Sequence, residues 1–229
     1  MSELDQNNSN KPAIAYPSSS ILLLRSGIEG FEVLMAKRSE SLRFAPGAYV
    51  FPGGKVDEED HINNPEMGFD DAAYRTAALR ELAEETGVNI AYSKASELVF
   101  FAHWVTPPES PKRFETRFYL AVSEEEHVLV KDGTETDEVM WVDPKRMLHD
   151  EEAGLVNMMF PTRLNLMKLC QSATIDEALS KAKAEETVKV MPEHELRNGE
   201  MWFTIPKSAG YPVHEVKREN IFELMGVKK

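Results

Sequence analysis

The chain has 229 residues, of which 42% are hydrophobic and 28% charged, and its formal net charge is −13. This length suits one globular domain with appendages. The acidic balance opposes a general nucleic-acid-binding surface, so no stable nucleic-acid partner is expected. No apolar run approaches the ~20 residues that cross a bilayer, so no membrane span is expected. The single cysteine excludes an internal disulfide framework, and with no signal- or transit-peptide pattern the expected location is the cytoplasm.

Strand patterns dominate the first two thirds of the chain, after a polar segment at residues 1–17 that is expected to be a disordered tail. Apolar, β-branched and aromatic runs between turn residues predict strands. They are expected at residues 18–25, 31–37, 46–54, 98–105, 117–122 and 139–142. The first two should form a hairpin.

One helix is expected within this strand-rich part, from about residue 71 to residue 86. Asp70 or Asp71 can cap its N-terminus, and Gly87 suits the left-handed position after its end.

After residue 144 the pattern turns helical, most clearly at residues 162–171 and 175–183, the second following a cap at Thr174. Residues 188–216 mix short β-like pieces with proline and glycine. We therefore predict one α/β domain over residues 18–229, with a core at 18–144 and a helical C-terminal extension at 145–229.

The most informative segment, residues 80–88, reads Arg-Glu-Leu-Ala-Glu-Glu-Thr-Gly-Val. On a helix, at about 100° per residue, Glu81, Glu84 and Glu85 share one face, with an apolar seam opposite. Carboxylates this close repel one another. Hard oxygen ligands converging on Mg²⁺ or Mn²⁺ would turn that repulsion into binding. The alternative is a solvated acidic helix face.

Neighbouring residues could complete such a metal site. Arg80, on the flank of the acidic face, could pair with a glutamate and fix its rotamer. Gly53 and Gly54 let the backbone bend tightly and could offer a carbonyl oxygen to the same metal ions.

The same residues resemble the signature of the Nudix hydrolase family: Gly, five residues, Glu, seven residues, then Arg-Glu-apolar-x-Glu-Glu-x-Gly-apolar. Residues 80–88 fit the second half at every fixed position, and Gly54 fits the opening glycine. The intervening segment is longer than the signature allows, so residues around 61–69 are expected to loop out. The first glutamate of the signature then corresponds to Asp60, or to Asp71 or Asp70 nearer the helix.

The resemblance implies the Nudix fold, a mixed β-sheet sandwiched between helices, and a metal-dependent pyrophosphohydrolase that uses Mg²⁺ or Mn²⁺. Its implied metal ligands are Glu81, Glu85, Glu84 and Gly54. Catalytic candidates are Glu81, Glu84, Glu135 and Glu138, although an acidic loop is an equally good interpretation of the last two. Arg80, Gly53 and Gly87 would have structural roles.

Residues 35–57 contain Arg-Ser-x-x-Leu-Arg followed by Pro-Gly-x-x-x-Phe-Pro-Gly-Gly-x-x-Asp. This pattern resembles the coenzyme A (CoA) diphosphatases, and residues 104–118 resemble the acyl-CoA branch with an interrupted Nudix box. The implied reaction cleaves CoA or acyl-CoA to 3′,5′-ADP and 4′-phosphopantetheine or its acylated form. Phosphate-binding candidates are Arg38, Arg43 and Arg113.

Two other functions compete with this interpretation. One is a Nudix enzyme for another small nucleotide or related compound, such as ADP-ribose, NADH or a capped RNA end. The other is a non-catalytic Nudix-fold binding module, which would be expected to lack metal-facing glutamates. Nudix proteins are often dimers, so a homodimer is expected as one alternative to a monomer.

Overall fold

The central strand, β1 (Ala15–Gly27), contains the longest apolar run near the N-terminus. Ile21 and Leu23 pack into one hydrophobic cluster, and Leu22 and Leu24 pack into another. Because successive side chains of a strand point to opposite faces, a strand buried on both sides needs such an unbroken apolar run. The structure is a computed structural model that describes residues 13–28, 30–61, 69–110 and 112–217.

In the described part of the chain, eight strands form one mixed sheet with the order β3-β2-β1-β6-β5-β8, to which β4 adds by pairing with β1 and β7 by pairing with β2. β1 runs parallel to β6 and antiparallel to β2 and β4. The further strands are β2 (Gly30–Arg38), β3 (Tyr49–Val50), β4 (Gly53–Lys55), β5 (Val99–Val105), β6 (Arg113–Val122), β7 (Thr136–Val142) and β8 (Lys189–Val190).

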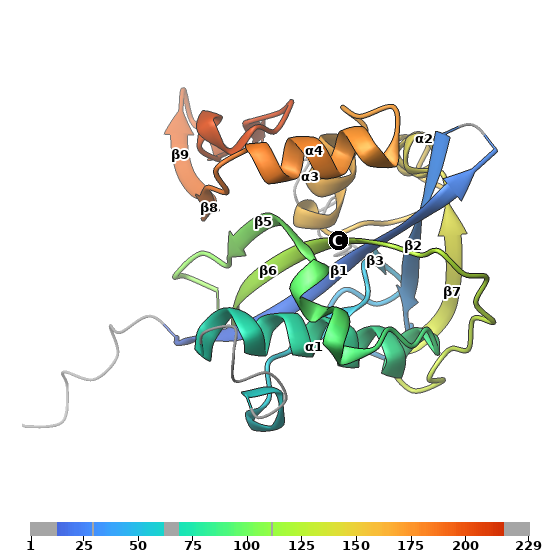
Figure 1. Cartoon of the computed structure of the whole chain (residues 1–229). Coiled ribbons are helices and arrows are strands. Elements are labelled where there is room, and N and C mark those ends of the chain that lie inside the picture. The colour runs from blue at the N-terminus through green and yellow to red at the C-terminus, as the bar shows by residue number, and fades with distance from the viewer. Residues whose placement is uncertain (1–12, 29, 62–68, 111, 218–229) are drawn as a thin grey trace, which may run out of the picture.

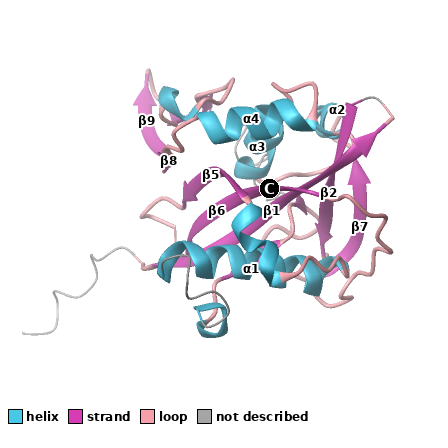
Figure 2. Ribbon diagram, viewed as in Figure 1, coloured by secondary structure: helices cyan, strands magenta, loops and turns pink. Residues whose placement is uncertain are grey.

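Helices cover both faces of this sheet (Figure 1). One cluster joins it to α1 and to the 3₁₀ helix η3, and the other joins it to α2, α3 and α4. Figure 2 shows the two helical layers with the strands between them. The helices are η1 (Glu58–His61), α1 (Phe69–Thr86), η3 (Tyr92–Glu97), α2 (Pro144–Glu152), α3 (Phe160–Leu169), α4 (Ile175–Ala184) and η4 (Lys207–Ala209). The predicted α/β sandwich is confirmed.

The sheet is split beside α1. β1 and β2 pair only next to the turn that joins them. Further along, residues 18–20 of β1 pair with β4, and residues 36–37 of β2 pair with β3. The segment from β3 to β4 therefore fills the gap between two diverging strands, and it faces the helix that carries the predicted acidic residues.

The C-terminal extension is helical first and β-rich later. After α4 the chain adds β8 to the main sheet, and then forms a second sheet of β9 (Glu193–Arg197), β10 (Glu200–Thr204) and β11 (Glu215–Lys217). Trp104 Nε1 donates to the Tyr211 hydroxyl at 2.8 Å, and that hydroxyl donates to Asn165 Oδ1 at 2.7 Å. These buried hydrogen bonds tie the segment around Tyr211 to β5 and α3.

Several predicted boundaries need correction. β1 begins at Ala15, because residues 15–17 already pair with β6, so the predicted tail ends too late; residues 1–12 lie outside the described residues. β6 likewise begins at Arg113 and not at residue 117. The Thr174 cap of α4 is confirmed, since its side chain accepts from the Glu177 N–H. None of the described helices has both the length and the apolar character that crossing a membrane requires.

The predicted N-terminal cap of α1 is wrong. The helix begins at Phe69, so Asp70 and Asp71 lie within its first turn and not at its N-cap. The Asp71 carboxylate instead accepts hydrogen bonds from Arg75, Arg117 and Tyr119. The Asp71 carboxylate is therefore engaged by two arginines and a tyrosine and does not cap the helix.

Candidate active site

The glutamate side chains on the acidic face of α1 differ in their exposure to solvent. Leu79, Leu82 and Thr86 are at most 1% exposed and form the apolar seam that the sequence predicts. On the carboxylate face, the Glu84 side chain is 59% exposed and that of Glu81 is 16% exposed. Glu85 is only 9% exposed as a whole residue. The three glutamates therefore do not line a solvated surface, which argues against the acidic-face alternative for Glu81 and Glu85.

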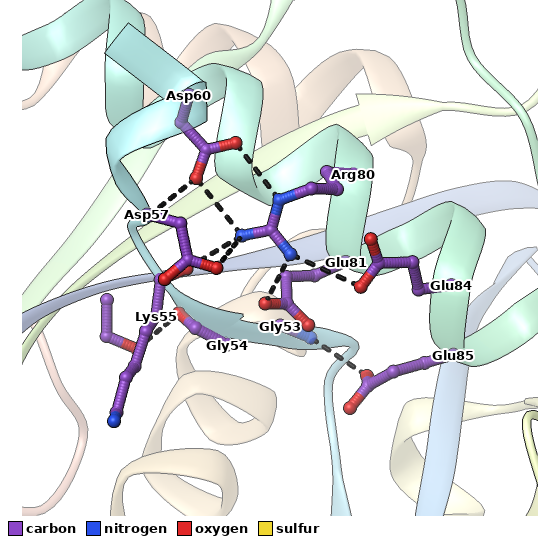
Figure 3. Close-up of polar contacts among 10 residues, drawn as sticks. Gly53, Gly54, Lys55, Asp57, Asp60, Arg80, Glu81, Glu84 and Glu85 are labelled. Atoms are coloured by element: carbon purple, nitrogen blue, oxygen red, sulfur yellow. Dashed lines mark hydrogen bonds and ion pairs between the residues drawn. The ribbon is translucent and has the colours of Figure 1, made fainter.

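The double glycine of β4 lies directly against this face (Figure 3). The Gly53 N–H donates to Glu85 Oε2 at 3.0 Å. A Cβ at Gly54 would lie 2.3 Å from Glu81 Oε1, far inside van der Waals contact. A residue with a side chain at this position would displace the Glu81 carboxylate from its place beside the strand.

The Gly54 carbonyl, predicted as a metal ligand, is already engaged with β1. Ser18 Oγ donates to it at 2.7 Å. Backbone hydrogen bonds also link β1 to Pro52 and Val56, two residues away on either side. In an antiparallel ladder such bonded pairs recur every second residue, so Gly54 is bonded to the backbone of its partner Ser19 as well. Both lone pairs of this oxygen are then used, which argues against the ligand role predicted for Gly54.

Gly53 has the opposite orientation. Its pairing with Ser20 is a non-hydrogen-bonded pair of the ladder, so its N–H and C=O both face away from β1. The hydrogen bond from its N–H to Glu85 fits this orientation. The carbonyl on the carboxylate side of the strand is therefore that of Gly53.

Arg80 organises the remaining carboxylates (Figure 3). Its Nε and Nη2 donate to the two oxygens of Asp60 at 3.1 and 3.0 Å, and Nη2 also donates to the Lys55 carbonyl at 2.9 Å. Its Nη1 donates to Glu81 at 2.9 Å and to Glu84 at 3.2 Å. These bonds, the one to Asp60 above all, raise the pKa of Arg80 above its ordinary value. The predicted pairing of Arg80 with a glutamate is therefore present.

The structure also separates the three candidates for the first acidic residue of the signature. Asp60 is 1% exposed and forms the two-pronged contact with Arg80. Asp71 instead pairs with Arg75 and Arg117. The side chain of Asp70 lies outside the described residues. Of the two candidates whose side chains are described, Asp60 is therefore the one that contacts Arg80 of the signature, and its place in the signature stays a prediction.

Electrostatics at the site favour a cation. Burial raises the pKa of Glu85 to about 8, against the lowering effect of the Gly53 N–H, and the charge of Glu81 raises it further. Burial also raises the pKa of Glu81, although Arg80 opposes this. Among the residues that the structure describes, no three acidic, histidine or cysteine side chains converge as a ready-made metal site. The buried oxygens of Glu81 and Glu85 nevertheless fit a hard divalent ion, whose charge would offset their desolvation.

Two predicted residues from outside the helix have charges that influence Glu85. Arg38, at the end of β2, lowers the pKa of Glu85, and Glu135 raises it, so both charges act on the buried carboxylate. Glu138 lies in β7 opposite Lys37 and accepts a hydrogen bond from the Tyr49 hydroxyl at 2.9 Å. Sequence reasoning missed Tyr49, because only the pairing of β2 with both β3 and β7 brings it to Glu138.

The other two predicted arginines behave differently. Arg43 is exposed and makes no ion pair or hydrogen bond with the rest of the described chain. Arg113 donates to the carbonyls of Thr106 and Ala13, and it pairs with Ala15 of β1. That position is five residues from Ser20, or roughly 16 Å along the strand. The structure does not bring Arg113 to the carboxylates.

Gly87 has the predicted left-handed conformation, with φ of 74°, and its N–H bonds to the Ala83 carbonyl at 3.0 Å.

A groove of about 670 Å³ lies between η3, β5 and α4, and it is lined by none of the predicted site residues.

Fold and site together define an α/β enzyme with buried carboxylates suited to divalent cations. The family model described as the NUDIX domain matches residues 16–159, and the chain belongs to the Nudix hydrolase family. These enzymes cleave pyrophosphate bonds and generally use divalent metal ions.

Individual relatives agree with this assignment. Putative nudix hydrolase 7 of Caenorhabditis elegans is 25% identical over 229 aligned residues, which cover 82% of this chain and 75% of that protein. Peroxisomal coenzyme A diphosphatase ndx-8 of the same organism is 44% identical over 69 residues, 30% of this chain and 25% of that one. Acyl-coenzyme A diphosphatase NUDT19 of Xenopus laevis is 20% identical over 254 residues, 73% of this chain and 66% of that one.

Among solved structures, a NUDIX hydrolase from Alicyclobacillus acidocaldarius superposes with a TM-score of 0.66 at 25% sequence identity. The match covers 73% of this chain and 96% of that one. The predicted family, fold and enzyme class are confirmed.

Proposed function

We propose that the protein hydrolyses the diphosphate bond of CoA or an acyl-CoA, releasing 3′,5′-ADP and 4′-phosphopantetheine or its acylated form. One observation carries the choice of substrate: Arg38, which belongs to the CoA-type sequence pattern, acts electrostatically on the buried Glu85. We therefore assign the pattern and the carboxylates to one substrate site. The similarity to two proteins named as CoA and acyl-CoA diphosphatases supports the same choice.

Glu81, Glu85 and Glu84 would hold Mg²⁺ or Mn²⁺, together with the carbonyl oxygen of Gly53. Bound ions of this kind neutralise phosphate oxygens and lower the pKa of a coordinated water. Arg80 and the Gly53 N–H hold the same carboxylate side chains in place. The buried position of Glu85 keeps competing water away from one side of the site.

Glu135 is the better of the two candidates for a general base outside the helix. Its charge acts on Glu85, whereas the Glu138 carboxylate is held by Tyr49. A base must reach the attacking water within about 3 Å, directly or through one intermediary. Glu84, the most exposed glutamate of the helix, is the alternative within the signature.

Arg38 and Arg43 would bind substrate phosphates. Arg38 is partly fixed by donating to the Phe44 carbonyl at 3.2 Å, and Arg43 is exposed and unpaired within the described chain. A guanidinium suits phosphate because its planar donors can bind two oxygens at once. Arg113 is not part of the proposed substrate site, because its guanidinium donates to backbone carbonyls at a distance from the carboxylates.

The test is a substrate panel with mass spectrometry of the products. Purified full-length protein is offered CoA, acyl-CoAs, ADP-ribose, NADH and a capped RNA oligonucleotide, each with Mg²⁺ or Mn²⁺ and with a chelator as control. Metal-dependent release of 3′,5′-ADP is the expected result. AMP from ADP-ribose with intact CoA would overturn the CoA proposal and leave the hydrolase assignment in place. Hydrolysis that survives the chelator would overturn the metal assignment.

A further inference from the structure

Two serines of β1 hold the loop that enters the active site. Ser18 Oγ donates to the Gly54 carbonyl at 2.7 Å. Ser20 Oγ lies 3.0 Å from the Pro52 carbonyl oxygen and 3.3 Å from that of Phe51. Both serines are less than 9% exposed. Their hydroxyls therefore contact three of the four carbonyls between residues 51 and 54.

The carbonyl that they leave out is that of Gly53, the residue whose N–H reaches Glu85. Two consecutive glycines give the backbone unusual rotational freedom, so their own conformational preferences do not fix the direction of this peptide group. Hydrogen bonds on both sides of Gly53 supply that restraint.

Ser19, between the two serines, provides an internal comparison. Side chains alternate along a strand, so Ser19 points to the opposite face of β1. Its hydroxyl donates to the Arg117 carbonyl at 3.5 Å, its one hydrogen bond with the described residues, and the residue is fully buried. Ser18 and Ser20 thus share the face of β1 that meets the loop, whereas Ser19 lies on the face that β1 turns to α1.

We infer that Ser18 and Ser20 are positioning residues, whose hydroxyls fix residues 51–54 so that the Gly53 peptide group faces Glu85. The inference deepens the proposed function, on which its consequence for metal binding rests. An alanine would fit in the space of either serine. The contribution of each hydroxyl is therefore to orient the loop carbonyls through its hydrogen bonds.

The test compares Ser18→Ala/Ser20→Ala with Ser19→Ala as the matched control. Amide exchange of Gly53 is followed by NMR, Mn²⁺ affinity by electron paramagnetic resonance, and folding by thermal melting. Loss of two hydrogen bonds of ordinary strength predicts about tenfold faster Gly53 exchange and about tenfold weaker Mn²⁺ binding in the double variant. Ser19→Ala should match the wild type in both, and Ser18→Thr/Ser20→Thr, which restores the hydroxyls, should recover both.

Gly53 exchange and Mn²⁺ affinity equal to those of Ser19→Ala would overturn the inference. If the double variant melts far below the control, Ser18→Ala alone makes the same comparison with a smaller change. If the wild type itself binds no Mn²⁺, the proposed Mn²⁺ site fails, and Gly53 exchange still decides whether the serines orient the loop.

Discussion

The Gly53 N–H and the Glu85 carboxylate, 32 positions apart in the sequence, are joined by a hydrogen bond of 3.0 Å. This contact fixes the C-terminal part of α1 against the split between β1 and β2. Within the described part of the chain, it gives this buried carboxyl group one backbone donor, which is less than its charged form needs when removed from water. A bound divalent cation would offset the remaining cost of burying the negative charge.

Glu85→Gln tests whether the Glu85 carboxylate binds such a cation. Glutamine keeps the size and the acceptor oxygen but removes the charge, so with a chelator present we expect a melting temperature at least equal to that of the wild type. Turnover of the substrate identified by the panel should fall by about two orders of magnitude or more, because bound metal ions contribute several kcal/mol of transition-state stabilisation. Undiminished turnover would remove Glu85 from the metal site.

Gly54→Ala should affect the site more than the stability. The new methyl group would meet the end of the flexible Glu81 side chain, which can move away and leave its place beside the strand. We expect about tenfold weaker Mn²⁺ binding with little change in the free energy of unfolding. Gly87→Ala should chiefly lower the free energy of unfolding, by about 1–2 kcal/mol, because φ there is 74°. The two variants are compared by urea unfolding and Mn²⁺ titration, and the reverse ranking would contradict both assignments.

Asp60 and Asp57 should differ sharply, although both lie near Arg80. The Asp60 side chain is 1% exposed and contacts Arg80 through both oxygens, whereas that of Asp57 is 61% exposed and 3.5 Å away. Asp60→Asn breaks a buried pair and should lower the free energy of unfolding by about 3 kcal/mol. Asp57→Asn should change it by less than about 1 kcal/mol. Urea unfolding of the two variants measures the difference, and equal effects would show that Arg80 is not anchored by Asp60.

Local sequence patterns predicted the features of this site that depend on one helix. The spacing of Glu81, Glu84 and Glu85 predicted a shared face, and the adjacency of Arg80 predicted its ion pair with a glutamate. The grading from exposed Glu84 to buried Glu85 was not predictable in the same way, because it depends on where β4 lies against α1.

Features that depend on strand register were predicted less well. The choice between the carbonyls of Gly53 and Gly54 is set by which residues of β1 bond with β4, and a one-residue shift would reverse it. The position of Arg113 likewise follows from the length of β6, which is extended by its pairing with β1. Long-range pairing of this kind leaves no pattern within the segment itself.

Asp71 should contribute to the loss of stability in acid. Burial alone would raise the pKa of Asp71, but Arg75, with Tyr119 and Arg117, outweighs it and holds the pKa below its ordinary value. A carboxyl group with a lowered folded pKa stabilises the fold above its unfolded pKa, and this stabilisation is lost as the pH falls through the folded pKa. The difference in free energy of unfolding between wild type and Asp71→Asn should therefore shrink as the pH falls from about 5 to about 3. A difference that stays constant over this range in urea unfolding would contradict the assignment.

Cys170, which follows α3 as its C-cap residue, should react slowly with alkylating agents. Burial raises the pKa of its thiol to about 11, and the charge of Asp143 adds to this while Lys145 opposes it. The thiolate is the reactive form of cysteine. At pH 8, a thiol pKa two units higher in the folded than in the unfolded chain lowers the thiolate fraction about a hundredfold. Mass spectrometry of the iodoacetamide adduct over time should show native protein reacting about a hundredfold more slowly than urea-unfolded protein, with the rate rising as the pH is raised above 8. Cys170→Ser controls for alkylation at other residues, and equal rates for native and unfolded protein would show that the α3 terminus leaves the thiol in water.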